Sequence, residues 1–213
     1  MTNPWLSIPL ADYEGHMGSD DIRQLAALAD LFGEALEIRR PESVAVLGIA
    51  GGNGLDRIDT AVTHRVLGID CNSSYLEAVR QRYAAIPGLE LHCLDLAEQP
   101  LQLQRVELVH AALVFEHAGL GRCLDNALAL IAPGGALSVV LQLPSETEAG
   151  VTPSRFVSIQ NLKSHFSLID EPSFRAGMEK RSYTLRYETR CSLPGGKSFW
   201  MGIFQPPEAL NTE

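Results

Sequence analysis

Hydrophobic residues follow two spacings in the middle of the chain, and the change from one to the other predicts alternating strands and helices. Short apolar runs that suit buried strands occupy residues 44–49, 65–69, 89–94, 108–112 and 137–141. Between them, apolar positions recur every three or four residues, as in helices, from 54 to about 61, after Asn72, and over 122–131. This alternation predicts an α/β fold: a doubly wound, mostly parallel sheet with helices on both faces.

The two ends of the chain follow other patterns. Residues 1–18 contain prolines and glycines and are expected to be irregular, whereas 19–40 predict a helix with Ser19 as its N-cap. Near the other end, 152–166 predict a helix, and two extended runs around a Pro-Gly-Gly turn predict an antiparallel hairpin. We therefore predict a single domain over 1–213, comprising an N-terminal segment and candidate lid (1–18), a helix (19–40), a core (44–143), and a C-terminal helix and hairpin (151–205).

Charge and composition narrow the classes of partner. The net charge is −9 and basic residues occur in pairs at most, which argues against a nucleic-acid partner. No apolar run approaches the roughly 18 residues of a membrane span, and the N-terminus lacks the pattern of a signal peptide. The four cysteines lie apart, without the spacing of a metal site. We expect a cytoplasmic protein with no membrane partner and no metal.

A glycine-rich turn follows the first predicted strand. The segment VLGIAGGNG, Val46–Gly54, contains four glycines. Glycines allow a tight turn and let a ligand approach the backbone closely, and the start of a following helix offers N–H groups to an anion. Because ligands of open α/β sheets bind beyond the carboxyl ends of the strands, this turn is a candidate binding site.

Two acidic residues end the next two strands and indicate the kind of ligand. Asp70 follows the second strand, where a carboxylate can accept hydrogen bonds from ribose hydroxyls, and Asp95 follows the third, where it can accept one from an adenine amino group. Both suit an adenosine-containing cofactor. The dinucleotide pattern G-x-G-x-x-G is not met, since its third position holds Arg57 when read from Gly52 and its second holds Ala50 when read from Gly48. A nicotinamide-dependent oxidoreductase is therefore the less favoured alternative.

Taken in order, these motifs resemble those of the class I S-adenosylmethionine-dependent methyltransferases. Residues 46–54, 66–83 and 91–96 resemble the first three motifs, while 107–117 and 127–140 resemble the fourth and fifth strands with their flanking turns. The resemblance implies a Rossmann-like seven-stranded sheet, the cofactor S-adenosylmethionine, the product S-adenosylhomocysteine and methyl transfer by in-line displacement. It also implies cofactor contacts from Gly48, Ala50, Gly52, Asn53, Gly54, Asp70, Cys71, Asp95, Leu96 and Ala111.

The chain departs from this family pattern in two places. Gly48 stands where the family has an acid that helps to hold the amino group of the cofactor, and Ala50 stands for the first glycine. The first departure leaves open a non-catalytic protein that retains the fold. After the fourth strand, residues 111–114 replace the [DNS]-P-P-[YFW] motif of amino-group methylation, and no Pro-Cys pair exists for cytosine C5 methylation. A small-molecule acceptor is the remaining expectation.

Candidate catalytic and substrate-binding residues lie in two segments. His16, Glu116 and His117 are the candidates for a general base, which is needed only if the acceptor must lose a proton. Glu116 and His117 have an alternative role in shaping the turn after the fourth strand. Segment 1–18 is either a lid that contacts the substrate or a strap packed on the sheet. If it is a lid, the substrate contacts expected from it are Trp5, Tyr13, His16 and Met17.

Overall fold

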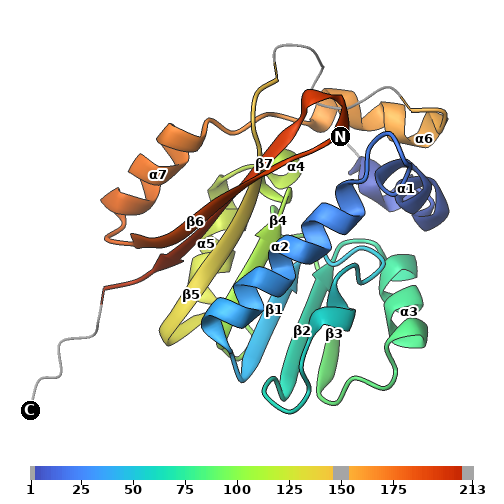
Figure 1. The fold of residues 1–213 in the computed structure, drawn as a ribbon. Coiled ribbons are helices and arrows are strands. Elements are labelled where there is room, and N and C mark those ends of the chain that lie inside the picture. The colour runs from blue at the N-terminus through green and yellow to red at the C-terminus, as the bar shows by residue number, and fades with distance from the viewer. Residues whose placement is uncertain (1–2, 146–153, 208–213) are drawn as a thin grey trace, which may run out of the picture.

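A seven-stranded sheet forms the centre of the computed structural model, which describes residues 3–145 and 154–207 (Figure 1). The strand order is β3-β2-β1-β4-β5-β7-β6. The first five strands are mutually parallel, and the last two form the predicted hairpin, with β7 antiparallel to β5. The bounds are β1 Ser43–Leu47, β2 Arg65–Asp70, β3 Leu89–Cys93, β4 Val106–Ala112, β5 Ile131–Gln142, β6 Thr184–Ser192 and β7 Ser198–Gln205. This is the predicted Rossmann-like sheet.

Helices cover both faces of the sheet because successive side chains of a strand point to opposite sides. The helices α2 (Gln24–Arg39) and α3 (Ser73–Arg82) cover one face, and α5 (Gly121–Ala129) and α7 (Glu171–Lys180) cover the other (Figure 1). In β1, Val44 packs on the face covered by α2 and α3, and Ala45 packs on the face covered by α5 and α7; both are fully buried. Burial on both faces explains why this strand reads as a continuous apolar run.

The N-terminal segment is helical, which corrects the expectation of an irregular stretch. A 3-10 helix, η1 (Pro4–Ser7), precedes α1 (Leu10–Met17). The side chain of Asn3 accepts the N–H of Trp5 and so caps η1. Ser19 is not the N-cap of the next helix, because α2 begins at Gln24 after a residue with a positive φ.

The helix predicted directly after the glycine turn is absent from this described part of the chain. Only one 3-10 turn, η2 (Leu55–Arg57), forms there, followed by a non-helical connection to β2. β-Branched residues are frequent between Ile58 and Thr63, and they lower helix propensity. The expected helix N-terminus is therefore not available to an anion.

The segment after β5 also differs from the prediction. Residues 152–153, the predicted start of a helix, lie outside the described residues, and the rest of that helix is two short pieces, α6 (Val157–Gln160) and η3 (Asn161–His165). The helix α7 was not predicted, although Asp170 caps it by accepting the N–H of Ser173. The expected turn at 132–135 lies within β5, where the pairing with β4 shifts register. Short elements α4 (Phe115–Ala118) and η4 (Pro194–Gly196) complete the described fold.

Candidate functional site

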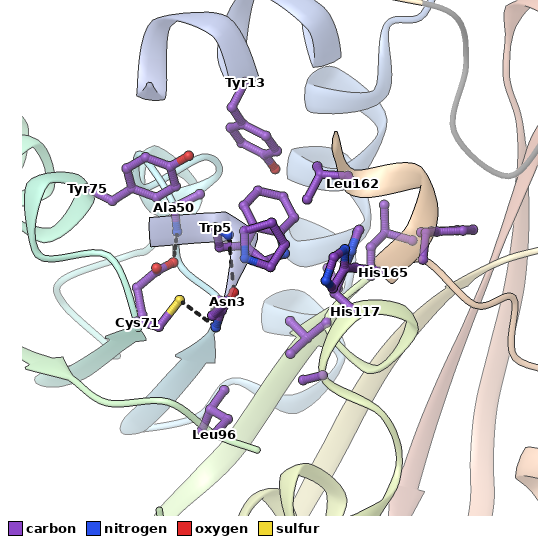
Figure 2. A pocket seen from close by; sticks show the side chains of 18 of the residues that line it. Asn3, Trp5, Tyr13, Ala50, Cys71, Tyr75, Leu96, His117, Leu162 and His165 are labelled. Carbon is purple, nitrogen blue, oxygen red and sulfur yellow. Dashed lines mark hydrogen bonds between the residues drawn. The ribbon is translucent and has the colours of Figure 1, made fainter. Parts of the chain in front are cut away.

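A cavity of about 550 Å³ lies at the carboxyl ends of the parallel strands. Its floor comes from the residues that end β1, β2, β4 and β5, and its cover comes from η1 and α1 on one side and α6 and η3 on the other (Figure 2). β1 and β4 are neighbours in the sheet although two strands separate them in sequence, so the strand order reverses there. The volume is typical of a small-molecule site, and the place is where the glycine turn and Asp70 predicted one.

Asp70 joins the end of β2 to the glycine turn. Its Oδ2 accepts the N–H of Ala50 at 2.9 Å and its Oδ1 accepts the N–H of Asn72 at 2.9 Å. Burial raises the pKa of this carboxyl group, while the two N–H groups act in the opposite direction. A carboxylate has about four acceptor positions, so Asp70 can accept further hydrogen bonds from a ligand in the cavity.

Asp95 lies on the loop after β3, which a buried amide holds in place. Its Oδ1 accepts the N–H of Ala97 at 3.0 Å and its Oδ2 accepts a hydrogen bond from the side chain of Asn3 at 2.8 Å. From α5, Asn126 donates to the carbonyl groups of Leu96 and Gln99 and accepts the N–H of Leu101. No sequence motif marks Asn126, because an amide that faces inward from a helix leaves no local pattern.

The residues of the glycine turn divide into two groups. Gly48 and Ala50 line the cavity, as do Asp70, Cys71, Asp95 and Leu96. The remaining predicted cofactor residues do not line it: Gly52 packs against Tyr83, Gly54 packs against α2, Asn53 donates to the carbonyl of Leu25, and Ala111 is fully buried in β4.

Gly48 cannot be exchanged for a larger residue without a change in packing. Its φ is +63°, in the left-handed region that favours glycine. A Cβ at this position would lie 2.8 Å from Cγ2 of Val114, which itself lines the cavity. The side chain of Val114 therefore occupies the space that the Cβ of an acidic residue at position 48 would need.

His117 stands at the other end of the cavity, between two aromatic rings. The imidazole of His117 packs edge-on against Trp5, with 4.9 Å between ring centroids, and against Phe166, with 5.2 Å. Figure 2 labels His117 and Trp5. The Nδ1 of His117 is buried and has no hydrogen-bond partner among the described residues. Burial, aided by the nearby charge of His165, lowers the pKa of His117 to about 4, so the ring is neutral at pH 7.

Glu116 does not line the cavity. Its Oε1 accepts the backbone N–H of Gln142 at 2.9 Å, which links α4 to the end of β5, and burial raises its pKa to about 7. His16 does line the cavity, and its pKa is lowered by burial and by the charge of Lys197. Trp5, Tyr13 and Met17, the other substrate candidates, line it as well.

Several cavity residues carry no signal in the sequence. Asn3, Gln24, Tyr75, His165, Phe166 and Lys197 line the wall, and they come from five different segments. Within residues 3–145 and 154–207, no cluster of His, Cys, Asp or Glu is arranged to hold a metal ion. No helix in the same ranges is long and apolar enough to cross a membrane.

Comparisons with known proteins agree with this architecture. Residues 44–135 match the family described as "Methyltransferase domain". A 107-residue stretch is 31% identical to an uncharacterized 37.1 kDa protein of transposon TN4556 from Streptomyces fradiae; it covers 49% of this chain and 31% of that protein. The chain thus matches about a third of the length of that relative.

Solved structures extend the likeness to nearly the whole chain. The N-methyltransferase NodS from Bradyrhizobium japonicum WM9, in complex with S-adenosylhomocysteine, has a TM-score of 0.68 at 16% identity over 97% of this chain and 100% of that one. Magnesium protoporphyrin IX methyltransferase (ChlM) from Synechocystis PCC 6803, with the same compound bound, has a TM-score of 0.70 at 14% identity over 94% and 96%. The chain therefore shares the fold of these methyltransferases, and its residues 44–135 match the family described as "Methyltransferase domain".

Proposed function

We propose that this protein transfers the methyl group of S-adenosylmethionine to a small-molecule acceptor. The observation that carries the proposal is the cavity at the reversal of strand order, where Gly48, Ala50, Asp70 and Asp95 share one wall. The fold supports it, since NodS and ChlM were both solved with S-adenosylhomocysteine bound.

The chemistry of this wall fits the proposed cofactor. Asp70 is buried and retains acceptor positions that suit the two hydroxyl groups of a ribose. Asp95 suits an adenine amino group, with Cys71 and Leu96 beside it in the wall. When bound, S-adenosylmethionine supplies a methyl group on a positively charged sulfur, which is electrophilic without further activation.

The residues of the chain then have to position an acceptor and exclude water. Trp5, His117 and Phe166 present aromatic surface to the cavity, which suits a partly apolar acceptor. Positioning of this kind can contribute about 7–11 kcal/mol to lowering a barrier. We propose His117 as the catalytic residue, because its neutral ring can accept a hydrogen bond from an acceptor N–H or O–H at neutral pH. Glu116 is then a positioning residue that acts through the backbone of Gln142.

A second candidate is a protein that keeps the fold without catalysis. The packing of Val114 against Gly48 favours it, because the family's acid has no room there. This candidate predicts weak binding of S-adenosylmethionine, or binding without turnover.

Calorimetric titration of the purified protein with S-adenosylmethionine, S-adenosylhomocysteine and NAD separates these functions. The proposed activity requires binding of the first two in the micromolar range and none of NAD. If none of the three ligands binds, the proposal is contradicted and the non-catalytic protein is favoured. Preferential binding of NAD would instead favour an oxidoreductase. If binding is found, a screen of small acceptors with radiolabelled methyl donor tests turnover, with His117→Phe as the variant that keeps an aromatic ring and removes the nitrogen atoms.

A further inference from the structure

Residues 3–17, here called the N-terminal cover, lie directly on the residues proposed to bind adenosine. The side-chain Nδ2 of Asn3 donates to Oδ2 of Asp95 at 2.8 Å and lies 3.6 Å from Sγ of Cys71 (Figure 2 shows the second contact). Since Oδ1 of Asp95 already accepts the N–H of Ala97, Asn3 holds the oxygen that faces the cover. Its amide N–H is a donor of the same kind as an adenine amino group.

The middle of the cover is tied to the start of α3. Asn72 donates from Nδ2 to the carbonyl of Trp5 at 2.9 Å, and the hydroxyl of Tyr75 donates to the carbonyl of Ile8 at 2.9 Å. At the end nearer α2, Glu14 forms an ion pair with Arg82. Of these partners, Tyr75 lines the cavity and Asn72 directly follows Cys71, which also lines it.

The cover also forms part of the acceptor end. Trp5 packs edge-on against His117, and Ile8 packs against Ile159 of α6 and Leu162 of η3, on the other side of the cavity. Ser158 donates to Asp12 at 2.6 Å across the same seam. The same short segment therefore walls both ends of the cavity.

The attachment of the cover to the rest of the protein suits a moving part. In the described chain, no backbone–backbone hydrogen bond joins residues 3–17 to any residue beyond Ser19. The cover is held by side-chain contacts, and Gly18, the residue that follows α1, joins it to the chain leading to α2. Segments held in this way open at lower free energy than strands in a sheet.

We propose that the N-terminal cover is a gate for the cofactor, and that Asn3 latches it shut by occupying the carboxylate oxygen of Asp95 that the adenine amino group needs. The proposal rests on the proposed function, since the ligand it admits is the adenosine part of S-adenosylmethionine. Opening frees Asp95, and closing over the ligand restores Trp5 and Tyr13 as walls of the acceptor end.

Stopped-flow fluorescence with S-adenosylhomocysteine tests the gate. Trp5 lies in the cover and Trp200 is fully buried in the sheet, so in a Trp200→Phe background the signal reports the cover. A gate predicts an observed rate that reaches a plateau as ligand concentration rises. Asn3→Ala should raise this plateau about tenfold, since a hydrogen bond to a charged group is lost. Gln104→Ala, which removes a side-chain amide at an exposed position outside the cavity wall and its cover, should leave it unchanged.

A rate that rises linearly with ligand concentration, or a plateau that Asn3→Ala leaves unchanged, would overturn the gate while binding itself upholds the proposed function. If neither the wild type nor Asn3→Ala binds S-adenosylhomocysteine, the proposed function fails. If Asn3→Ala binds S-adenosylhomocysteine and the wild type does not, both the gate and the proposed function are supported, because the latch is then what keeps the wild type closed.

A covalent lock supplies a second measurement. In Asn3→Cys, the new thiol replaces a side chain whose Nδ2 lies 3.6 Å from Sγ of Cys71, and an added oxidant that takes two electrons and two protons from the pair closes a disulfide, which mass spectrometry verifies. Calorimetry should then show at least a tenfold loss of S-adenosylhomocysteine binding that dithiothreitol reverses, with oxidised wild type as control because Cys71 and Cys93 are also close. Equal binding by the locked and reduced variant would refute the gate.

Discussion

Restoring the family's acid by Gly48→Asp should harm this protein rather than improve it. The position has a φ of +63°, and a Cβ there would lie 2.8 Å from Cγ2 of Val114. Val114 cannot withdraw without moving into the cavity that it lines. We therefore expect both stability and cofactor affinity to fall.

The magnitude follows from two separate costs. A non-glycine residue in the left-handed region costs about 1 kcal/mol, and overpacking a filled site costs about 1–3 kcal/mol. Together they lower the free energy of unfolding by about 2–4 kcal/mol, which for a chain of this size corresponds to a fall in Tm of about 5–15 °C.

Urea unfolding of four proteins isolates the steric part: wild type, Gly48→Asp, Val114→Ala and the double variant. Val114→Ala removes the methyl group that the new side chain meets, so it should recover about 1–2 kcal/mol in the double variant relative to the sum of the single changes. Titration with S-adenosylhomocysteine on the same set should follow the same order. If Gly48→Asp unfolds within about 0.5 kcal/mol of wild type, or binds the ligand more tightly, the packing argument is wrong.

Three further changes test other parts of the protein. Asp70→Asn places an amide N–H against the N–H of Ala50 or of Asn72. The free energy of unfolding should therefore fall by about 2 kcal/mol, and the affinity for S-adenosylhomocysteine should fall more than tenfold. An unaltered affinity in calorimetry would show that Asp70 does not bind the ribose. Asn126→Ala leaves the polar groups of Leu96, Gln99 and Leu101 without their partner and should cost about 2–3 kcal/mol in urea unfolding, with Asn161→Ala as the neutral control. His110 has a pKa lowered by burial from 6.5 to about 3, so the unfolded chain binds more protons below pH about 6.5 and stability declines from there toward pH about 3. His110→Gln should flatten this decline in urea titrations across pH, and an unchanged slope would show that other groups cause it.

The sheet was predictable because its strands are marked by local sequence. Residues 44–47 are buried on both faces, so every position there is apolar, and short connections to the next elements leave few possible topologies. The position of Asp70 and Asp95 at the cavity was predictable for a similar reason, since a residue that ends or closely follows a parallel strand lies at the binding edge whatever the rest of the chain does.

Elements whose form depends on packing were predicted less well. The segment after Gly54 has apolar residues at helical spacing, but it forms a single 3-10 turn whose Leu55 is buried against α2. Short helices such as α6 gain little from propensity and form where tertiary contacts hold them.

By itself the sequence determined the succession of the strands along the chain, the place of the glycine turn and the two acidic residues after strands, because each of these follows from residues that are neighbours in the chain. Only the tertiary structure decided that Val114 fills the space beside Gly48, and that Asn3 lies on Asp95 although 92 positions separate them. Contacts of this kind depend on how independently formed segments pack together, and no local pattern of residues records which side chains will meet.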